Sequence, residues 1–198
     1  LVDVRVGSGI YVRRARAGAA SADVFGDSPG PFELIRARRL IESEVAESAA
    51  RTARESDIAG IGEAVRLMKT DIHGGDVYET NDRLFHVRIA EATRNSVLVS
   101  VVNMLWDLRE SPVYANLMRH AVTDGVRTRS IADHERILRA LAARNPAGAR
   151  LAMQKHIDRV AREYERDWPL VASEMNGVTN GHAPAARRRA ARRRAGRS

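Results

Sequence analysis

The residue types and spacing best suited to chemistry belong to Asp82, His86, His134 and His156. Asp82 and His86 lie four residues apart, so they are neighbours on one helix surface. Each histidine falls on the apolar face expected for a different amphipathic helix. A polar group aimed at a core costs free energy unless a partner satisfies it. One divalent cation at the centre of a helical bundle would satisfy all four groups together.

Imidazole and carboxylate ligands suit zinc, nickel, iron or manganese better than calcium. We expect zinc first, with nickel, manganese and iron as alternatives. Another interpretation is that each histidine is separately buried, neutral and hydrogen-bonded to a neighbour, and spacing alone leaves both open. The remaining histidines are poor candidates, because His73 lies at a predicted helix end, His120 in a predicted loop and His182 in a C-terminal tail. We expect these three to be solvated.

Arg38 precedes Glu42 by four residues. The pattern alone favours a surface ion pair of little energetic value, and the alternative is an arginine turned into the bundle to grip a carboxylate. Trp106 and Trp168 are expected to be packing residues. The chain has no glycine-rich phosphate loop, no arrangement typical of a nucleophile and no pair of acids that stands out as general acid and base.

The elements that must position these side chains are helices. Apolar residues recur at helical spacing from Pro31 onward, and proline, glycine and capping residues divide the pattern. The predicted helical segments are about 31–54, 56–73, 76–93, 95–112, 123–144 and 145–174. Because the connections are short, we expect an all-α fold: an antiparallel bundle of six or seven helices with a short N-terminal β-hairpin.

Four regions follow one another along the 198 residues. Residues 1–12 alternate valines with polar residues around a Gly-Ser-Gly turn, which predicts strand–turn–strand. Residues 13–30 read as a linker, residues 31–175 as the helical domain, and residues 176–198 as a disordered tail rich in arginine.

The basic character of the chain belongs to its tail. Seven arginines in residues 176–198 account for all but one unit of the net charge of +8. Such a run can bind phosphate backbones without reading sequence, or simply be a solvated tail. The chain has no cysteine, which excludes disulfides and thiolate chemistry, and no apolar run of membrane-spanning length. We therefore expect a cytoplasmic protein without a membrane partner.

Residues 31–165 resemble the C-terminal effector domain, or FCD domain, of FadR-type GntR transcriptional regulators. The stretches that carry the resemblance are FELIRARRLIESEVAESAA, NDRLFHVRIAEATRNSVL and DHERILRALAARNPAGARLAMQKHI, in that order. The segment VRVGSGIYV is similar to the wing that ends a GntR winged helix-turn-helix. The rest of that DNA-binding domain, with its recognition helix, is missing from the match.

The resemblance implies that Asp82, His86, His134 and His156 are the metal ligands. It also implies that a small organic acid binds beside or onto the metal, with Arg38 as a carboxylate partner. Arg5, Gly7, Ser8 and Gly9 of the wing would then contact DNA, and the protein would be a homodimer.

Two functions follow from these expectations. The first is a ligand-responsive transcriptional regulator whose helical domain binds a divalent metal and a carboxylate metabolite that modulates DNA binding. The second is a metal-dependent hydrolase or lyase that uses the His/Asp site, since such sites with open positions are chemically competent. The wing and the lack of an obvious general base favour the regulator, and we expect no enzymatic activity.

Overall fold

The computed structural model describes the backbone of residues 2–5, 9–12 and 29–181 and the side chains of residues 29–170. From Pro31 onward it is helical, which confirms the predicted all-α bundle. The elements are α1 (Pro31–Thr52), α2 (Glu55–Thr70), α3 (Asp76–Ala92), α4 (Ser96–Asp107), a short 3-10 turn η1 (Leu108–Glu110), α5 (Pro112–Ala121), α6 (Asp124–Ala142) and α7 (Pro146–Gly181). No helix in the described ranges is long and apolar enough to cross a membrane.

Two short strands, β1 (Val2–Arg5) and β2 (Gly9–Val12), pair antiparallel, with Val2 opposite Val12. Their assignment to a DNA-binding wing stays a prediction. Gly7 and Ser8 of the predicted turn lie outside the described residues, as do most of the predicted linker and the tail from residue 182.

Side-chain caps begin three of the helices where the sequence predicts them. Asn95 before α4, Thr123 before α6 and Asn145 before α7 each accept a hydrogen bond from a backbone N–H in the following first turn. In α2 the acid predicted to precede the helix lies within it instead. Asp57 accepts a hydrogen bond of 2.7 Å from the backbone N–H of Arg54, so it caps the helix from its first turn.

Helix α5 was not predicted as a separate element, because Pro112 was interpreted only as the end of the preceding helix. Pro112 occupies the first turn of α5, where its missing N–H costs no hydrogen bond, and Ser111 caps the helix. Tyr114 and Leu117 of α5 are buried in the core. The expectation that His120 lies in a loop was therefore wrong, since His120 lies in the last turn of α5.

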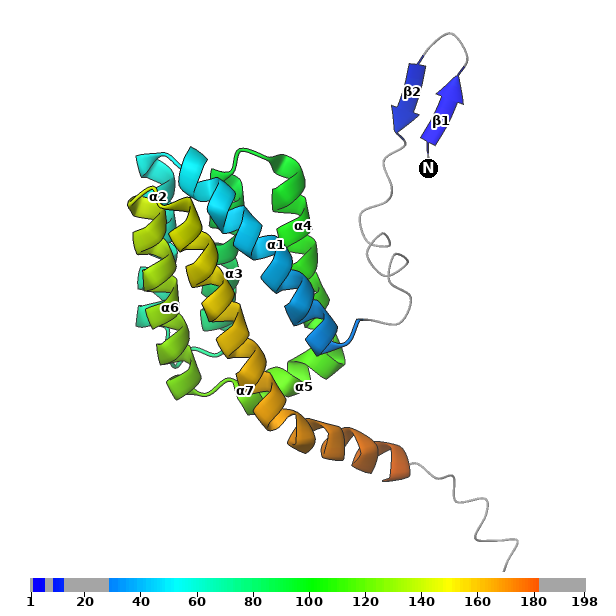
Figure 1. Ribbon diagram of the computed structural model, residues 1–198. Coiled ribbons are helices and arrows are strands. Elements are labelled where there is room, and N and C mark those ends of the chain that lie inside the picture. The colour runs from blue at the N-terminus through cyan, green and yellow to red at the C-terminus, as the bar shows by residue number, and fades with distance from the viewer. Residues whose placement is uncertain (1, 6–8, 13–28, 182–198) are drawn as a thin grey trace, which may run out of the picture.

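The bundle places α1, α3, α6 and α7 around a common centre. Helix α7 packs along α1 and α6, while α3 packs against α1, α2 and α4. Figure 1 shows α1, α7 and α6 across the front of the bundle with α3 behind them. Chain segments far apart in sequence thus meet in the middle of the molecule.

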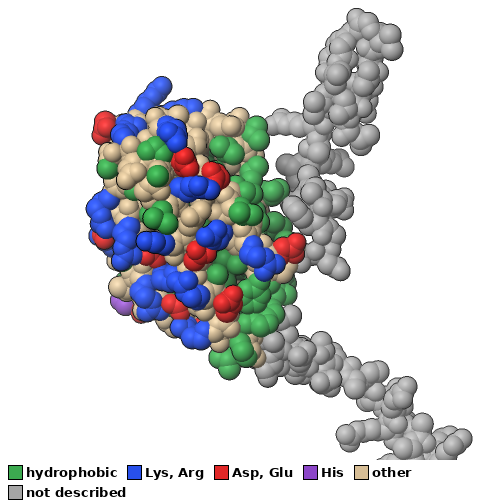
Figure 2. Space-filling view, viewed as in Figure 1, with side chains coloured by type: hydrophobic (Ala, Val, Ile, Leu, Met, Phe, Trp, Pro, Cys, Tyr) green, Lys and Arg blue, Asp and Glu red, His purple; other side chains and the backbone are tan. Residues whose placement is uncertain are grey.

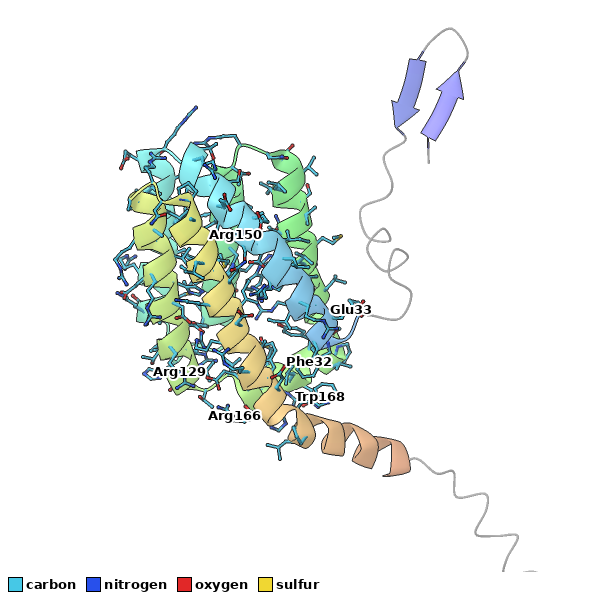
Figure 3. All side chains as sticks on the ribbon, in the orientation of Figure 1. Phe32, Glu33, Arg129, Arg150, Arg166 and Trp168 are labelled. Carbon is cyan, nitrogen blue, oxygen red and sulfur yellow. The ribbon has the colours of Figure 1, made fainter. Side chains whose placement is uncertain are left out.

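The lower end of the bundle is closed by an aromatic pair. Phe32 at the start of α1 meets Trp168 of α7 edge to face, with ring centroids 5.2 Å apart (Figure 3). Trp168 is therefore a packing residue, as predicted. Helix α7 contains Pro169 and turns away from the bundle beyond this point (Figure 1). It continues to Gly181, further than the expected end near Glu174.

Candidate metal centre

The structure brings the four predicted ligands together at the centre of the bundle. Asp82 and His86 come from α3, His134 from α6 and His156 from α7. The Nε2 atoms of His134 and His156 lie 3.2 Å apart. The Oδ1 atom of Asp82 lies 3.4 Å from Nε2 of His134 and 3.6 Å from Nε2 of His86. One nitrogen from each histidine lies within 4.8 Å of the others, so the three could hold a metal ion.

Burying these polar side chains costs free energy unless a further group, such as a cation, binds them. His134 is fully buried, and His86 and His156 are 2% and 3% exposed. Oδ1 of Asp82 and Nε2 of His86 are buried without a hydrogen-bond partner. Metal bonds of about 2.0–2.1 Å, at angles between 90° and the tetrahedral value, put neighbouring ligand atoms about 2.8–3.4 Å apart. The three distances given above for the four side chains are close to these values, so the residues fit a divalent cation.

The protonation states of Asp82, His134 and His156 suit a cation. Burial and the neighbouring His156 lower the pKa of His134 well below its ordinary value, and burial likewise lowers the pKa of His156. Burial alone would raise the pKa of Asp82, but His86, His134 and Arg109 together lower it. Metal ligands must be deprotonated, and an ionised aspartate with two neutral imidazoles meets this requirement.

A carboxylate contacts the second ring nitrogen of His86, Nδ1. This Nδ1 atom lies against Oε2 of Glu42 on α1. Burial alone would lower the pKa of His86, but Glu42 and Asp82 outweigh burial and raise it. A carboxylate on the far nitrogen of a ligating histidine fixes the orientation of the ring. From the sequence, Glu42 was predicted only as the partner of Arg38, and its contact with His86 was not predicted.

Asp133 has a similar place behind His156. Its Oδ2 atom lies 3.6 Å from Nδ1 of His156 and accepts a hydrogen bond of 2.6 Å from Nε of Arg159. The Arg159 side chain also donates to the hydroxyl of Ser130. Asp133 directly precedes His134 in sequence, yet it faces the other histidine.

The surface ion pair favoured for Arg38 and Glu42 was wrong. Arg38 is 3% exposed and Glu42 2% exposed, and Nε of Arg38 donates to Oε1 of Glu42 at 2.6 Å. The guanidinium of Arg38 also stacks on the ring of Trp106 at 4.5 Å. Arg38 does turn into the bundle, but its Nε atom is committed to Glu42.

A small cavity of about 30 Å³ lies beside the cluster. Its lining includes Asp82 and His156 together with the arginines Arg38, Arg109 and Arg127. A larger pocket of about 670 Å³ opens next to it, between α3, α4 and α5. The two share five lining residues, namely Glu79, Arg109, Met118, Val122 and Arg127. We call these five residues the neck, because the outer pocket meets the inner cavity there.

Arg109 is a site residue that sequence analysis did not single out. Its side chain is 9% exposed, and its guanidinium stacks on the ring of Trp106 at 3.9 Å. Trp106 is buried as predicted, and it supports both Arg38 and Arg109. A signal was available, because Arg109 follows the apolar α4 directly and precedes the helix-starting proline of α5.

The remaining candidates lie away from the centre or outside the described chain. His73 is largely exposed and contacts Asp124 at 2.7 Å. His182 lies outside the described residues, as do Gly7 and Ser8 of the predicted wing, whereas Arg5 and Gly9 lie in β1 and β2.

The helical bundle and its buried cluster of one aspartate and three histidines can be compared with known protein families. Residues 33–159 match the model of the FCD domain family, which is more than half of the chain. The chain therefore belongs to the FCD domain family, and the resemblance to GntR-type regulators is confirmed.

Named transcriptional regulators are among the relatives of the chain. The chain is 38% identical over 167 residues to the Uxu operon transcriptional regulator of Escherichia coli K12, covering 81% of this chain and 65% of that protein. It is 33% identical over 162 residues to the Exu regulon transcriptional regulator of the same organism, covering 79% of this chain and 61% of that protein. Among solved structures, Streptococcus agalactiae GntR superposes with a TM-score of 0.60 at 22% identity, covering 81% of this chain and 74% of that one.

The chain spans less than two thirds of the length of the two Escherichia coli relatives. Both are named transcriptional regulators. These names favour the regulator over the alternative of a metal-dependent hydrolase or lyase.

Proposed function

We propose that this chain is the effector-sensing part of a ligand-responsive transcriptional regulator. Its helical domain binds one divalent metal through Asp82, His86, His134 and His156, with zinc the first expectation and nickel, manganese or iron as alternatives. The observation that carries the proposal is the buried cluster of these four side chains beside a cavity lined by arginines. The metal would supply a positive charge at the end of the cavity, where an anionic group can bind.

The effector is proposed to be a small carboxylic acid in the inner cavity. A carboxylate there would lie beside Asp82 and His156 on one side and Arg38 on the other. An organic anion loses its hydration when it is buried, and only a strongly cationic site offsets that cost. Three arginines in one cavity lining meet this need together with the metal.

The DNA-binding part of the function rests on the N-terminal segment. Arg5, Gly7, Ser8 and Gly9 would form the contacts of a wing with DNA, in a protein that acts as a homodimer on a two-fold operator. Effector binding would change the arrangement of the two helical domains, and with it the spacing of the attached DNA-binding domains.

Metal analysis combined with a stability screen tests the proposal. We expect about one metal ion per chain in the purified protein, and little in a His134→Ala/His156→Ala variant, which should also unfold at a lower temperature. Small mono- and dicarboxylic acids should raise the unfolding temperature of the metal-loaded protein, and a chelator should abolish the shift. Stoichiometric metal in the double variant, or stabilisers that are uncharged or indifferent to chelation, would contradict the proposal.

A further inference from the structure

The neck contains a partly buried ion pair, and the proposed function gives no role to its acid. Nη2 of Arg109 donates a hydrogen bond of 2.9 Å to Oε2 of Glu79. Arg109 belongs to the turn η1 after α4, while Glu79 lies in the first turn of α3. Both residues line the outer pocket and the inner cavity, so their pair lies where the two meet.

The pair leaves half of the arginine's terminal donors unused. Nη1 of Arg109 is buried without a hydrogen-bond partner, and its nearest acid is Oδ2 of Asp82 at 3.7 Å. A buried N–H without an acceptor costs free energy, and an oxyanion placed there would recover it. Because the two terminal nitrogens of a guanidinium match the two oxygens of a carboxylate, Arg109 offers a bidentate site.

A carboxylate that binds both terminal nitrogens must share Nη2 with Glu79 or displace Glu79 from it. Glu79 is itself a carboxylate, so in the ligand-free protein it occupies part of the position that an incoming carboxylate would take. Its charge also interacts with Arg109 and Arg127, the two cationic residues of the neck.

We infer that Glu79 is an internal competitor for Arg109, which the carboxylate of the effector displaces, so that Glu79 sets the affinity of the site. This inference rests on the proposed function, because it concerns the same carboxylate. In this inference Arg109 recognises the anion. Glu79 competes with the anion for Arg109 and so sets the affinity that a ligand needs in order to bind. The ligand class is an acid whose carboxylate can form two parallel hydrogen bonds with a guanidinium.

The charge of Glu79 can be removed with little change of shape. In Glu79→Gln the side-chain carbonyl can still accept the hydrogen bond from Arg109, but the anion is gone. Glu110→Gln is a matched control, because Glu110 lines the same outer pocket with a side chain that is 79% exposed. Each zinc-loaded protein is titrated calorimetrically with acetate, malonate, succinate and citrate, and the tightest binder is used for comparison.

We expect Glu79→Gln to bind that acid about 3- to 10-fold more tightly than the unchanged protein, since ionic hydrogen bonds are about twice as strong as neutral ones. The Glu110→Gln control should stay within about twofold, because an exposed charge is largely screened. The gain should also depend on Arg109: in an Arg109→Gln background, the change at Glu79 should leave the affinity unaltered.

The outcomes separate the inference from the proposed function. If an acid binds the unchanged protein and Glu79→Gln binds it no more tightly, the inference is overturned while the proposed function stands. If no acid binds either protein, both fail. If Arg109→Gln does not fold, the comparison of Glu79→Gln with Glu110→Gln decides the matter alone.

Discussion

At the scale of single residues, Glu42 connects the first helix to the candidate metal ligands. One of its oxygens accepts from Arg38 and the other lies against Nδ1 of His86. All three side chains are buried. Burial alone would raise the pKa of Glu42, but Arg38 and His86 together lower it, so the carboxylate stays ionised. Arg38 therefore helps to orient a candidate metal ligand, His86, through Glu42.

Replacing this carboxylate should weaken the metal site without removing a ligand. We expect Glu42→Gln to lower metal affinity about 10- to 100-fold, which is typical when the group behind a ligating histidine is changed. A competition titration with a metal-binding dye measures the effect. Glu44→Gln is the control, because Glu44 lies on the same helix but is exposed and pairs with Arg150. Equal affinities in the two variants would show that Glu42 does not act on His86.

The four candidate ligands could be identified in the sequence because each interrupts an otherwise apolar helix face, which is unfavourable without a partner. Residues that contact the candidate ligands, such as Glu42 and its partner Arg38, were harder to identify. Arg38 and Glu42 lie on the same stripe as Leu34 and Val45, and all four are buried. Their spacing of four, however, is equally typical of a surface ion pair. Only tertiary packing against His86 and Trp106 distinguishes the two cases.

At the scale of elements, α5 closes the pocket that leads to the centre. Tyr114, Met118 and Val122 line the outer pocket from α5 and its end. The helix packs on α7, where the hydroxyl of Tyr114 donates a hydrogen bond of 3.1 Å to that of Tyr164. The position of this short helix therefore decides the shape of the pocket.

Truncating the buried anchor of α5 should destabilise the whole domain. Leu117 is fully buried, and we expect Leu117→Ala to cost about 2–5 kcal/mol in the free energy of unfolding, from lost burial and the cavity left behind. Urea denaturation followed by circular dichroism measures this value. Arg119→Ala, at an exposed position of the same helix, should change stability by no more than about 0.5 kcal/mol. A loss of that small size in Leu117→Ala would mean that α5 contributes little to the core.

Most helices were predictable because proline, asparagine and threonine mark their starts and the apolar period is long. Helix α5 has only ten residues and begins with a proline, so its pattern is too short to separate from a loop. Its apolar positions are Tyr114, Leu117 and Ala121. They can be recognised as core positions only once α7 is known to pack against α5.

At the scale of the whole molecule, one side of the bundle is apolar. Figure 2 shows hydrophobic side chains gathered along the edge where α1 and α4 lie in Figure 1. Leu40 of α1 and Val97 of α4 are each 67% exposed. A contiguous apolar face of a soluble domain is typical of an interface, and a second copy of the chain would cover it with the same face.

A charge at Leu40, an exposed apolar residue of α1, should prevent the proposed dimer. We expect Leu40→Glu to convert a dimer into a monomer in size-exclusion chromatography with light scattering. Helical content should be unchanged, because Leu40 makes little contact with the core. Leu151→Glu, at a half-exposed position of α7, is the control and should leave the mass unaltered. A dimer that survives Leu40→Glu would place the interface elsewhere.

DNA binding by these 198 residues should be dominated by phosphate contacts. We expect weak binding that is insensitive to sequence and falls steeply with salt, with each neutralised phosphate adding about −0.9 to the slope of log affinity against log salt. Deleting residues 183–198 removes seven arginines and should remove most of the binding, as a filter-binding assay at several salt concentrations would measure. Tight, sequence-selective binding would show that the DNA-reading surface lies elsewhere.

The stacking of Trp106 gives the centre an optical readout. Its ring lies under the guanidinium of Arg109 at 3.9 Å and 5.1 Å from the ring of His86, so its excited state senses the local charge. Because Trp168 is the second tryptophan of the chain, Trp168→Phe leaves one emitter. Its fluorescence maximum should shift when a metal ion or an acid binds. An unchanged spectrum during a calorimetrically proven binding event would contradict this. Occupancy could thus be followed continuously, without a label.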